Sequence, residues 1–117
     1  MTTHTDRELL ELAAKAAGIQ IDYSRFNGGG TKNNGFDLAG NAVLDWHNYK
    51  TWNPLTDDGD ALRLAVKLKM SVTVFDDAVG IGLRKVDYCE YDITPDPCAA
   101  TRRAIVRAAA EIGGIAK

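Results

Sequence analysis

The sequence predicts a single α+β domain covering residues 1–117, with three helices and an antiparallel or mixed sheet of about four to five strands. Three segments repeat apolar residues at helical spacing, and the segments between them alternate apolar and polar residues. The order is helix, strands, helix, strands, helix, which differs from the repeating strand–helix–strand units of a parallel sheet. A chain of 117 residues, 45% of them hydrophobic, can also bury a core of its own.

The first predicted helix covers residues 6–17 and carries signals at both ends. Thr5 and Glu8 form a Thr-x-x-Glu capping box, in which each side chain accepts a hydrogen bond from the other residue's backbone N–H. Gly18 follows the helix and suits the left-handed conformation that ends many helices. The predicted buried stripe consists of Leu9, Leu12, Ala13 and Ala16.

The second and third predicted helices cover residues 57–69 and 97–112. Thr56 is the predicted N-cap of the second helix, and acidic residues fill its first turn, where the helix dipole favours negative charge. Asp96 is the predicted N-cap of the third helix, and Gly113-Gly114 is its predicted stop. The expected core residues are Ala61, Leu62, Ala65 and Leu68 in the second helix and Ile105, Ala109 and Ile112 in the third.

Strands are predicted between the helices, where apolar and polar residues alternate with a period of two. They cover residues 19–23, 42–46, 71–75 and 85–91, and residues 36–38 are expected to pair with the second of them. Residues 76–83 are expected to form a hairpin connection and a short strand.

Composition and charge exclude several classes of protein. The net charge is −2, from 14 Lys and Arg against 16 Asp and Glu, which argues against bulk nucleic-acid binding. No apolar run reaches the roughly 18 residues of a membrane span, and the N-terminal residues lack the apolar segment of a secretory signal. The two cysteines predict reduced thiols in a cytoplasmic protein. Without metal-ligand spacing or a catalytic constellation, we expect no enzymatic activity, metal or cofactor.

A glycine-rich segment covers residues 27–35. Its Gly-Thr-Lys order differs from that of a phosphate-binding P-loop, and no helical period follows it. The segment is predicted to be a mobile hairpin loop. If it contributes to binding, Gly28, Gly29 and Gly30 would form a flexible lid over a ligand.

Aromatic side chains gather just before the second predicted helix. Trp46, His47, Tyr49 and Trp52 lie within seven positions, and both tryptophans of the chain are among them. Rings in such a loop either fill the core or stack on a ligand. Both alternatives remain open at this point.

Arginines mark the third predicted helix. Arg102 lies close to the apolar stripe, so it needs a carboxylate or an anionic ligand such as a phosphate. The candidate carboxylates are Asp57, Asp60 and Glu90. Arg103 and Arg107 are four residues apart on one face and are expected to be solvated.

Residues 52–61, Trp-Asn-Pro-Leu-Thr-Asp-Asp-Gly-Asp-Ala, resemble the NinX-type family of small proteins from tailed phages and prophages. The similarity continues to residue 70 and extends to the N-terminal helix and its stop, residues 9–19. The closing Pro-x-x-Ala-x-Arg-Arg-Ala helix, residues 97–112, also matches. Most members of the family are uncharacterised, so the resemblance implies a setting, the cytoplasm of an infected bacterium, and no activity.

The resemblance leads to a first hypothesis of a phage accessory protein that acts by stoichiometric binding and sequesters a nucleotide-type immune signal of the host. Trp52 would then stack on a base, Asn53 would bind a base edge, and Arg102 would bind phosphate, with Arg103, Trp46 and Tyr49 as further ligand contacts. The ligand would be a phosphate-bearing small molecule, and the protein would be a homo-oligomer.

Two alternatives come from other classes of protein. One is a protein-interaction module that inhibits or modulates a host or phage protein, docking through the edge of its sheet or its aromatic loop. The other is a hydrolase of unknown type, for which the sequence supplies no nucleophile in a recognisable context.

Overall fold

The computed structural model describes residues 4–24, 35–83 and 86–115, which form three helices and five antiparallel strands. The helices are α1 (Asp6–Ala17), α2 (Asp58–Lys67) and α3 (Pro97–Ile115). One sheet pairs β1 (Ala42–Asp45) with β2 (Lys50–Trp52), and the other has the order β3 (Ser71–Val74), β4 (Ala78–Leu83), β5 (Val86–Tyr91). The predicted α+β class is confirmed, with the strands divided between two small sheets.

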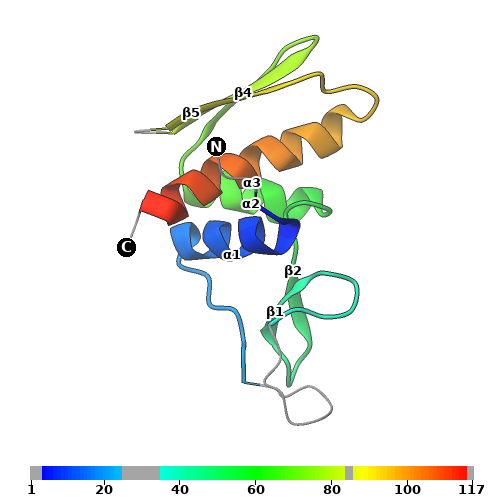
Figure 1. The fold of residues 1–117 in the computed structure, drawn as a ribbon, viewed down its shortest axis with the longest axis vertical. Helices are drawn as coiled ribbons and strands as arrows, with labels where there is room; N and C mark the ends of the chain where they lie inside the picture. The colour runs from blue at the N-terminus through cyan, green and yellow to red at the C-terminus, as the bar shows by residue number, and fades with distance from the viewer. Residues whose placement is uncertain (1–3, 25–34, 84–85, 116–117) are drawn as a thin grey trace.

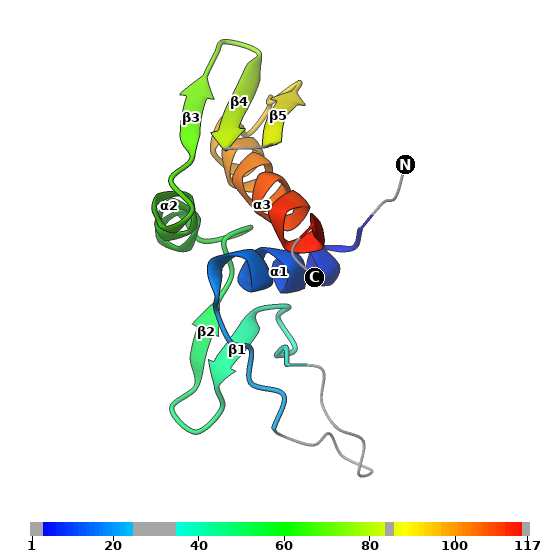
Figure 2. The same cartoon turned by 90° about the vertical axis from the view of Figure 1, so that its left-hand side faces the viewer.

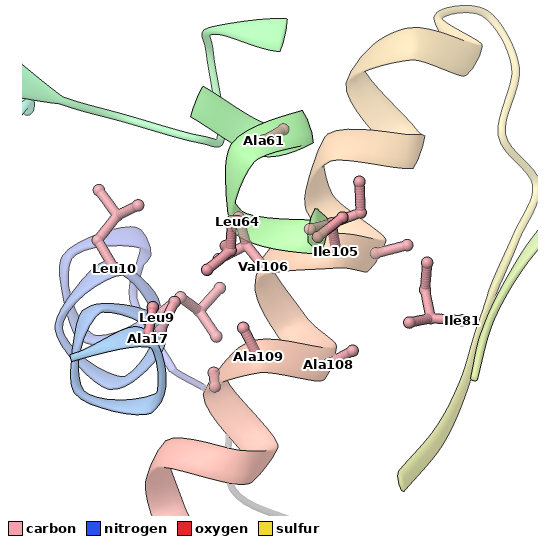
Figure 3. Close-up of a cluster of buried hydrophobic side chains, with 14 of the residues drawn as sticks. Leu9, Leu10, Ala17, Ala61, Leu64, Ile81, Ile105, Val106, Ala108 and Ala109 are labelled. Carbon is pink, nitrogen blue, oxygen red and sulfur yellow. The ribbon is translucent and has the colours of Figure 1, made fainter. Parts of the chain in front are cut away.

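α3 is the central element of the fold. Figures 1 and 2 show the three-stranded sheet on one side of α3 and the other two helices on the opposite side. In Figure 3, Leu9 of α1 and Leu64 of α2 approach α3 from one direction and Ile81 of β4 approaches it from another. Because α3 is enclosed in this way, its alanines at 104, 108, 109 and 110 are all buried.

The predicted ends of α1 are confirmed, and its buried stripe differs from the prediction. Thr5 and Glu8 form the capping box, and Gly18 ends the helix with a φ of 72°. The buried residues are Leu9, Leu10, Ala13, Ala14 and Ala17, whereas Leu12 and Ala16 are half-buried. The face in contact with α3 is therefore rotated relative to the predicted stripe.

α2 begins one residue later than predicted and buries a different leucine. Asp57, rather than Thr56, is the N-cap, and its Oδ2 accepts a hydrogen bond from the Asp60 N–H at 2.8 Å. Leu64 is buried, whereas Leu62, a predicted core residue, is 64% exposed. The prediction for Leu62 is wrong because the face toward α3 is formed by residues 61, 64 and 65.

α3 begins as predicted and continues past its predicted stop. Asp96 Oδ1 accepts a hydrogen bond from the Ala99 N–H at 3.1 Å, and the helix starts at Pro97. The helix then runs through Gly113 and Gly114. A Cβ at Gly113 would lie 2.0 Å from the carbonyl oxygen of Leu12, so glycine here permits close approach to α1.

Most predicted strands are present, with four differences. Residues 76–83, predicted as a connection with a short strand, contain the six-residue strand β4, and β2 falls in a segment predicted as loop. The predicted strand at 19–23 is absent, because its described pairing with β1 is limited to one bond from the Asp22 N–H to the Val43 carbonyl. The expected pairing of residues 36–38 is reduced to a single bridge between Phe36 and Ala42.

Candidate functional site

Asn53 occupies the centre of the corner that joins β2 to α2. Its backbone N–H donates to Asp60 Oδ2 at 2.9 Å, its Oδ1 accepts from the Leu55 N–H at 3.1 Å, and its Nδ2 donates to Asn41 Oδ1 at 3.0 Å. Asn53 is 8% exposed and the preceding Trp52 is 5% exposed. Both side chains are therefore packed inside the fold at this corner.

Arg102 reaches the same corner from α3. Its Nε donates to the Leu55 carbonyl at 2.9 Å, and its Nη1 lies 2.6 Å from Asp58 Oδ1. Asn53 and Arg102, two of the predicted ligand-binding residues, thus converge on opposite ends of one residue, Leu55. The side-chain amide of Asn53 and the Nε and Nη1 groups of Arg102 are thus engaged in hydrogen bonds within the protein.

The carboxylate that binds Arg102 differs from the three candidates drawn from the sequence. Asp57 caps α2, Asp60 pairs with Arg63 at 2.8 Å, and Glu90 pairs with Arg107 at 3.1 Å. Asp58 is the carboxylate that remains on the first turn of α2, and it faces α3.

A polar cluster links α3 to β5. Arg107 Nη1 lies 3.1 Å from both the Tyr88 hydroxyl and Glu90 Oε1, and the Tyr88 hydroxyl donates to Glu90 Oε1 at 2.7 Å. Burial and the bond to Glu90 raise the pKa of Tyr88, and the bond with Tyr88 raises the pKa of Arg107. Arg107, expected to be solvated, is instead part of this helix–sheet contact.

Trp46 and Tyr49, the other predicted aromatic ligand contacts, make contacts within and beside the β1–β2 hairpin. Trp46 Nε1 donates to the Asp22 carbonyl at 2.9 Å, and its ring centroid lies 6.3 Å from that of Tyr49. Hydrogen bonds from Ser24 and the Trp46 N–H lower the pKa of the Asp22 carboxyl. The Tyr49 hydroxyl donates to Asp37 Oδ2, although the residue itself is exposed.

Arg103 and the predicted lid complete the set of sequence-based candidates. Arg103 Nη1 lies 3.6 Å from Asp6 Oδ1, which joins α3 to the first turn of α1. Gly28, Gly29 and Gly30 lie outside the described residues. Ligand binding by the six candidate side chains stays a prediction.

A surface that sequence reasoning missed lies on α2 and β3. Eight large hydrophobic residues are exposed in the described part of the chain, and five of them fall between residues 62 and 75. Phe75 lies on the opposite face of β3, beside Gly80, so we call the other four residues the β3 surface: Leu62, Val66, Val72 and Val74. Figure 2 shows α2 and β3 on the same flank of the molecule, away from β5. Isolated apolar residues are normal at a surface, whereas a concentration of them marks an interaction site.

The outer face of the same sheet holds a shallow hollow of about 360 Å³. Gly80 and Gly82 lie opposite Thr73 and Ser71 across the β3–β4 ladder, so β4 contributes no side chains to this face there. The described residues that line the hollow include Asp87 and no Lys or Arg. The described lining of the hollow therefore offers hydroxyl groups and a carboxylate, and none of its residues is a cation that could bind a phosphate.

Comparison with known proteins identifies no relative: no protein-family model, curated protein or solved structure matches the chain. Among the described residues, no three His, Cys, Asp or Glu side chains gather where they could hold a metal ion. Within the same ranges, no helix combines the length and apolar character needed to cross a membrane.

Proposed function

We propose that this protein is a phage- or prophage-encoded accessory protein that acts in the host cytoplasm by stoichiometric binding. Of the two binding mechanisms considered, we favour the protein-interaction module over the sequestration of a nucleotide. The observation that carries this choice is the β3 surface, an apolar surface that borders an edge strand of the sheet.

An edge strand supplies two kinds of contact to an extended protein partner. Its outward N–H and C=O groups can pair with a partner strand, and its alternate side chains can pack against that strand's neighbours. β3 offers both, because it lies at the end of the order β3-β4-β5 and its residues Val72 and Val74 are exposed. No α-helix of the described chain covers this strand in Figure 2.

The polar residues favour a protein over a nucleotide as the partner. Asn53 and Arg102 make their hydrogen bonds within the corner that positions α2, and Trp52 is buried beside them. A nucleotide would have to displace these contacts or bind elsewhere, and the hollow on the sheet lacks a described cation for its phosphates. Nucleotide binding by Trp52, Asn53 and Arg102 would therefore require a rearrangement of the corner.

A matched pair of substitutions tests the proposal. Val74→Lys places a charge on the β3 surface, whereas Leu38→Lys changes a fully exposed apolar residue in the loop before β1. Tagged full-length protein and both variants would be incubated with bacterial extract, and captured complexes would be sized by light scattering. We expect wild type and the Leu38 variant to form the same stoichiometric complex, with a second copy or another chain, and the Val74 variant to lose it.

Two results would contradict the proposal. If the Val74→Lys and Leu38→Lys variants form the complex equally well, the β3 surface is not part of the binding site. A nucleotide that raises the melting temperature of wild type and of both variants alike, and that is recovered unmodified after denaturation, would support sequestration instead. Recovery of a chemically converted nucleotide would support an enzyme.

A further inference from the structure

The hydrogen-bond phase of β3 determines which backbone groups face outward. The Phe75 N–H donates to the Ala78 carbonyl at 2.8 Å, which makes these two residues a hydrogen-bonded pair of the antiparallel ladder. Because such pairs alternate along a ladder, Thr73 and Ser71 also face β4 with their N–H and C=O groups. The N–H and C=O groups of Val72 and Val74 consequently point away from the sheet.

We propose that the partner of the β3 surface is a second copy of this chain, whose β3 pairs antiparallel with the first about a two-fold axis at Thr73. This inference rests on the proposed interaction function and names its partner. In this register Val72 lies opposite Val74 of the second copy, and Val74 lies opposite Val72 of the second copy. All the outward N–H and C=O groups of both strands are then used, which gives four hydrogen bonds and a continuous six-stranded sheet.

The side chains agree with this register and disagree with its neighbours. Val72 and Val74 share one face of β3, so valine packs beside valine and Thr73 faces its own copy on the other face. A shift of one residue would bring valines onto the hydroxyl face. A shift of two in one direction would place Val74 opposite Met70, whose N–H already donates to the Ala65 carbonyl at 2.9 Å. In the other direction it would place Val72 opposite the charged Asp76.

Charge selects the antiparallel orientation and a second copy of β3. Lys69 precedes the strand and Asp76 and Asp77 follow it, so the two ends of the edge carry opposite charges. Antiparallel pairing brings the cationic end of one copy to the anionic end of the other, whereas parallel pairing would bring like charges together. The opposite edge, β5, carries the exposed carboxylate of Asp87 and no Lys or Arg, so it offers no cation to face that carboxylate.

β3 is short, but it lacks three other features that keep edge strands apart: proline, charge and a bulge. Ser71–Val74 contains no proline and no charged residue, and its register with β4 is regular, without a bulge. Figure 2 shows no described element beyond it. Two-fold pairing consumes both β3 edges and leaves only the acidic β5 edges at the ends of the joined sheet, so the assembly stops at a dimer.

Disulfide trapping tests the register directly. In the full chain with Cys89 and Cys98 replaced by Ser, Thr73→Cys places two thiols at a non-hydrogen-bonded pair, where Cα atoms are about 4.5 Å apart and within disulfide range. Ser71→Cys is the matched control on the same exposed face. Its two copies would be separated by four residue steps along the strands, roughly 13 Å, and should not cross-link.

We expect mild oxidation to convert most of the Thr73→Cys protein, and almost none of the Ser71→Cys protein, to covalent dimer. Equal cross-linking of the two variants, or none with Thr73→Cys, would overturn the inference. As an independent measurement, Lys69→Asp and Asp77→Lys should each weaken the dimer roughly tenfold, because each reverses two symmetry-related charge contacts. The double variant should recover the dimer, and no recovery would contradict the pairing.

The outcome separates this inference from the function on which it rests. Two results together would overturn the self-pairing and leave the interaction module standing. Light scattering would find only monomer at about 100 µM, and the Val74→Lys variant would no longer capture a different chain that the wild type captures. Only monomer, together with equal behaviour of Val74→Lys and Leu38→Lys, would overturn both.

Discussion

Replacing Asn53 with Ala tests whether this residue serves the fold. The substitution removes the bonds from Asn53 Oδ1 to the Leu55 N–H and from Nδ2 to Asn41 Oδ1. Each bond contributes about 1 kcal/mol, and the partly buried groups left without a partner add about 1–2 kcal/mol more. We therefore expect the free energy of unfolding to fall by about 3–4 kcal/mol, which for a domain of this size lowers Tm by roughly 12–16 °C.

The control for this prediction is a second asparagine in an exposed turn. Asn48 Nδ2 donates to Asp45 Oδ2 at 2.8 Å on the surface of the β1–β2 hairpin, so Asn48→Ala should cost about 0.5 kcal/mol. Urea unfolding followed by tryptophan fluorescence measures both variants. Equal losses in the two variants would refute the reasoning. If the Asn53→Ala variant keeps its free energy of unfolding but no longer binds a nucleotide that the wild type binds, the result would support a ligand-binding role for Asn53.

Two further predictions concern helix packing and pH. Gly113→Ala should lower the free energy of unfolding by about 1–3 kcal/mol, because its Cβ would collide with the Leu12 carbonyl. Gly114→Ala is the control: it has open space around it and should raise the free energy of unfolding by about 0.5 kcal/mol. Equal chemical-denaturation midpoints for the two variants would contradict the close contact between α3 and α1. Burial and the hydrogen bond to Glu11 raise the pKa of Tyr23 to about 12 in the folded protein, above the value of about 10 in the unfolded chain. The protonated Tyr23 hydroxyl therefore stabilises the folded state fully below pH 10, and this stabilisation is lost as the pH rises toward 12. The stability difference between wild type and Tyr23→Phe should shrink over that range, and a constant difference would contradict the assignment.

Features set by interactions within a few residues could be predicted from the sequence. The capping box of Thr5 and Glu8, the left-handed Gly18 and the start of α3 at Asp96 and Pro97 are all present. Each depends on hydrogen bonds or backbone preferences that span at most four positions. Their physical cause is contained in the local sequence, whatever the rest of the chain does.

Features set by packing between distant segments could not be predicted in the same way. Gly113 looks like a helix terminator, and only the approach of Leu12 shows why glycine is needed inside α3. Leu62 and Leu64 both fit an apolar face of α2, and the position of α3 decides that Leu64 is buried. The alternation at residues 19–23 predicts a strand, but a strand also needs a neighbour that accepts its hydrogen bonds along its length.

The candidate site shows the same division. The structure brings Asn53 and Arg102, two candidates from the sequence, to the N-terminal end of α2, and their binding of a ligand stays a prediction. Their shared contact, the backbone of Leu55, could not be recognised, because a backbone group carries no sequence signal. The exposure of Val72 and Val74 was equally hidden, since an alternating strand looks the same at the centre of a sheet and at its edge.

The corner at Asn53 and the β3 surface are connected through α2. The Trp-Asn-Pro segment and Arg102 fix the N-terminal end of α2, and the same helix carries Leu62 and Val66 before it leads into β3. The Trp-Asn-Pro segment therefore positions the β3 surface without forming part of it. Weakening the corner should loosen α2 and reduce binding through β3, whereas substitutions on the β3 surface should reduce binding and leave the free energy of unfolding nearly unchanged.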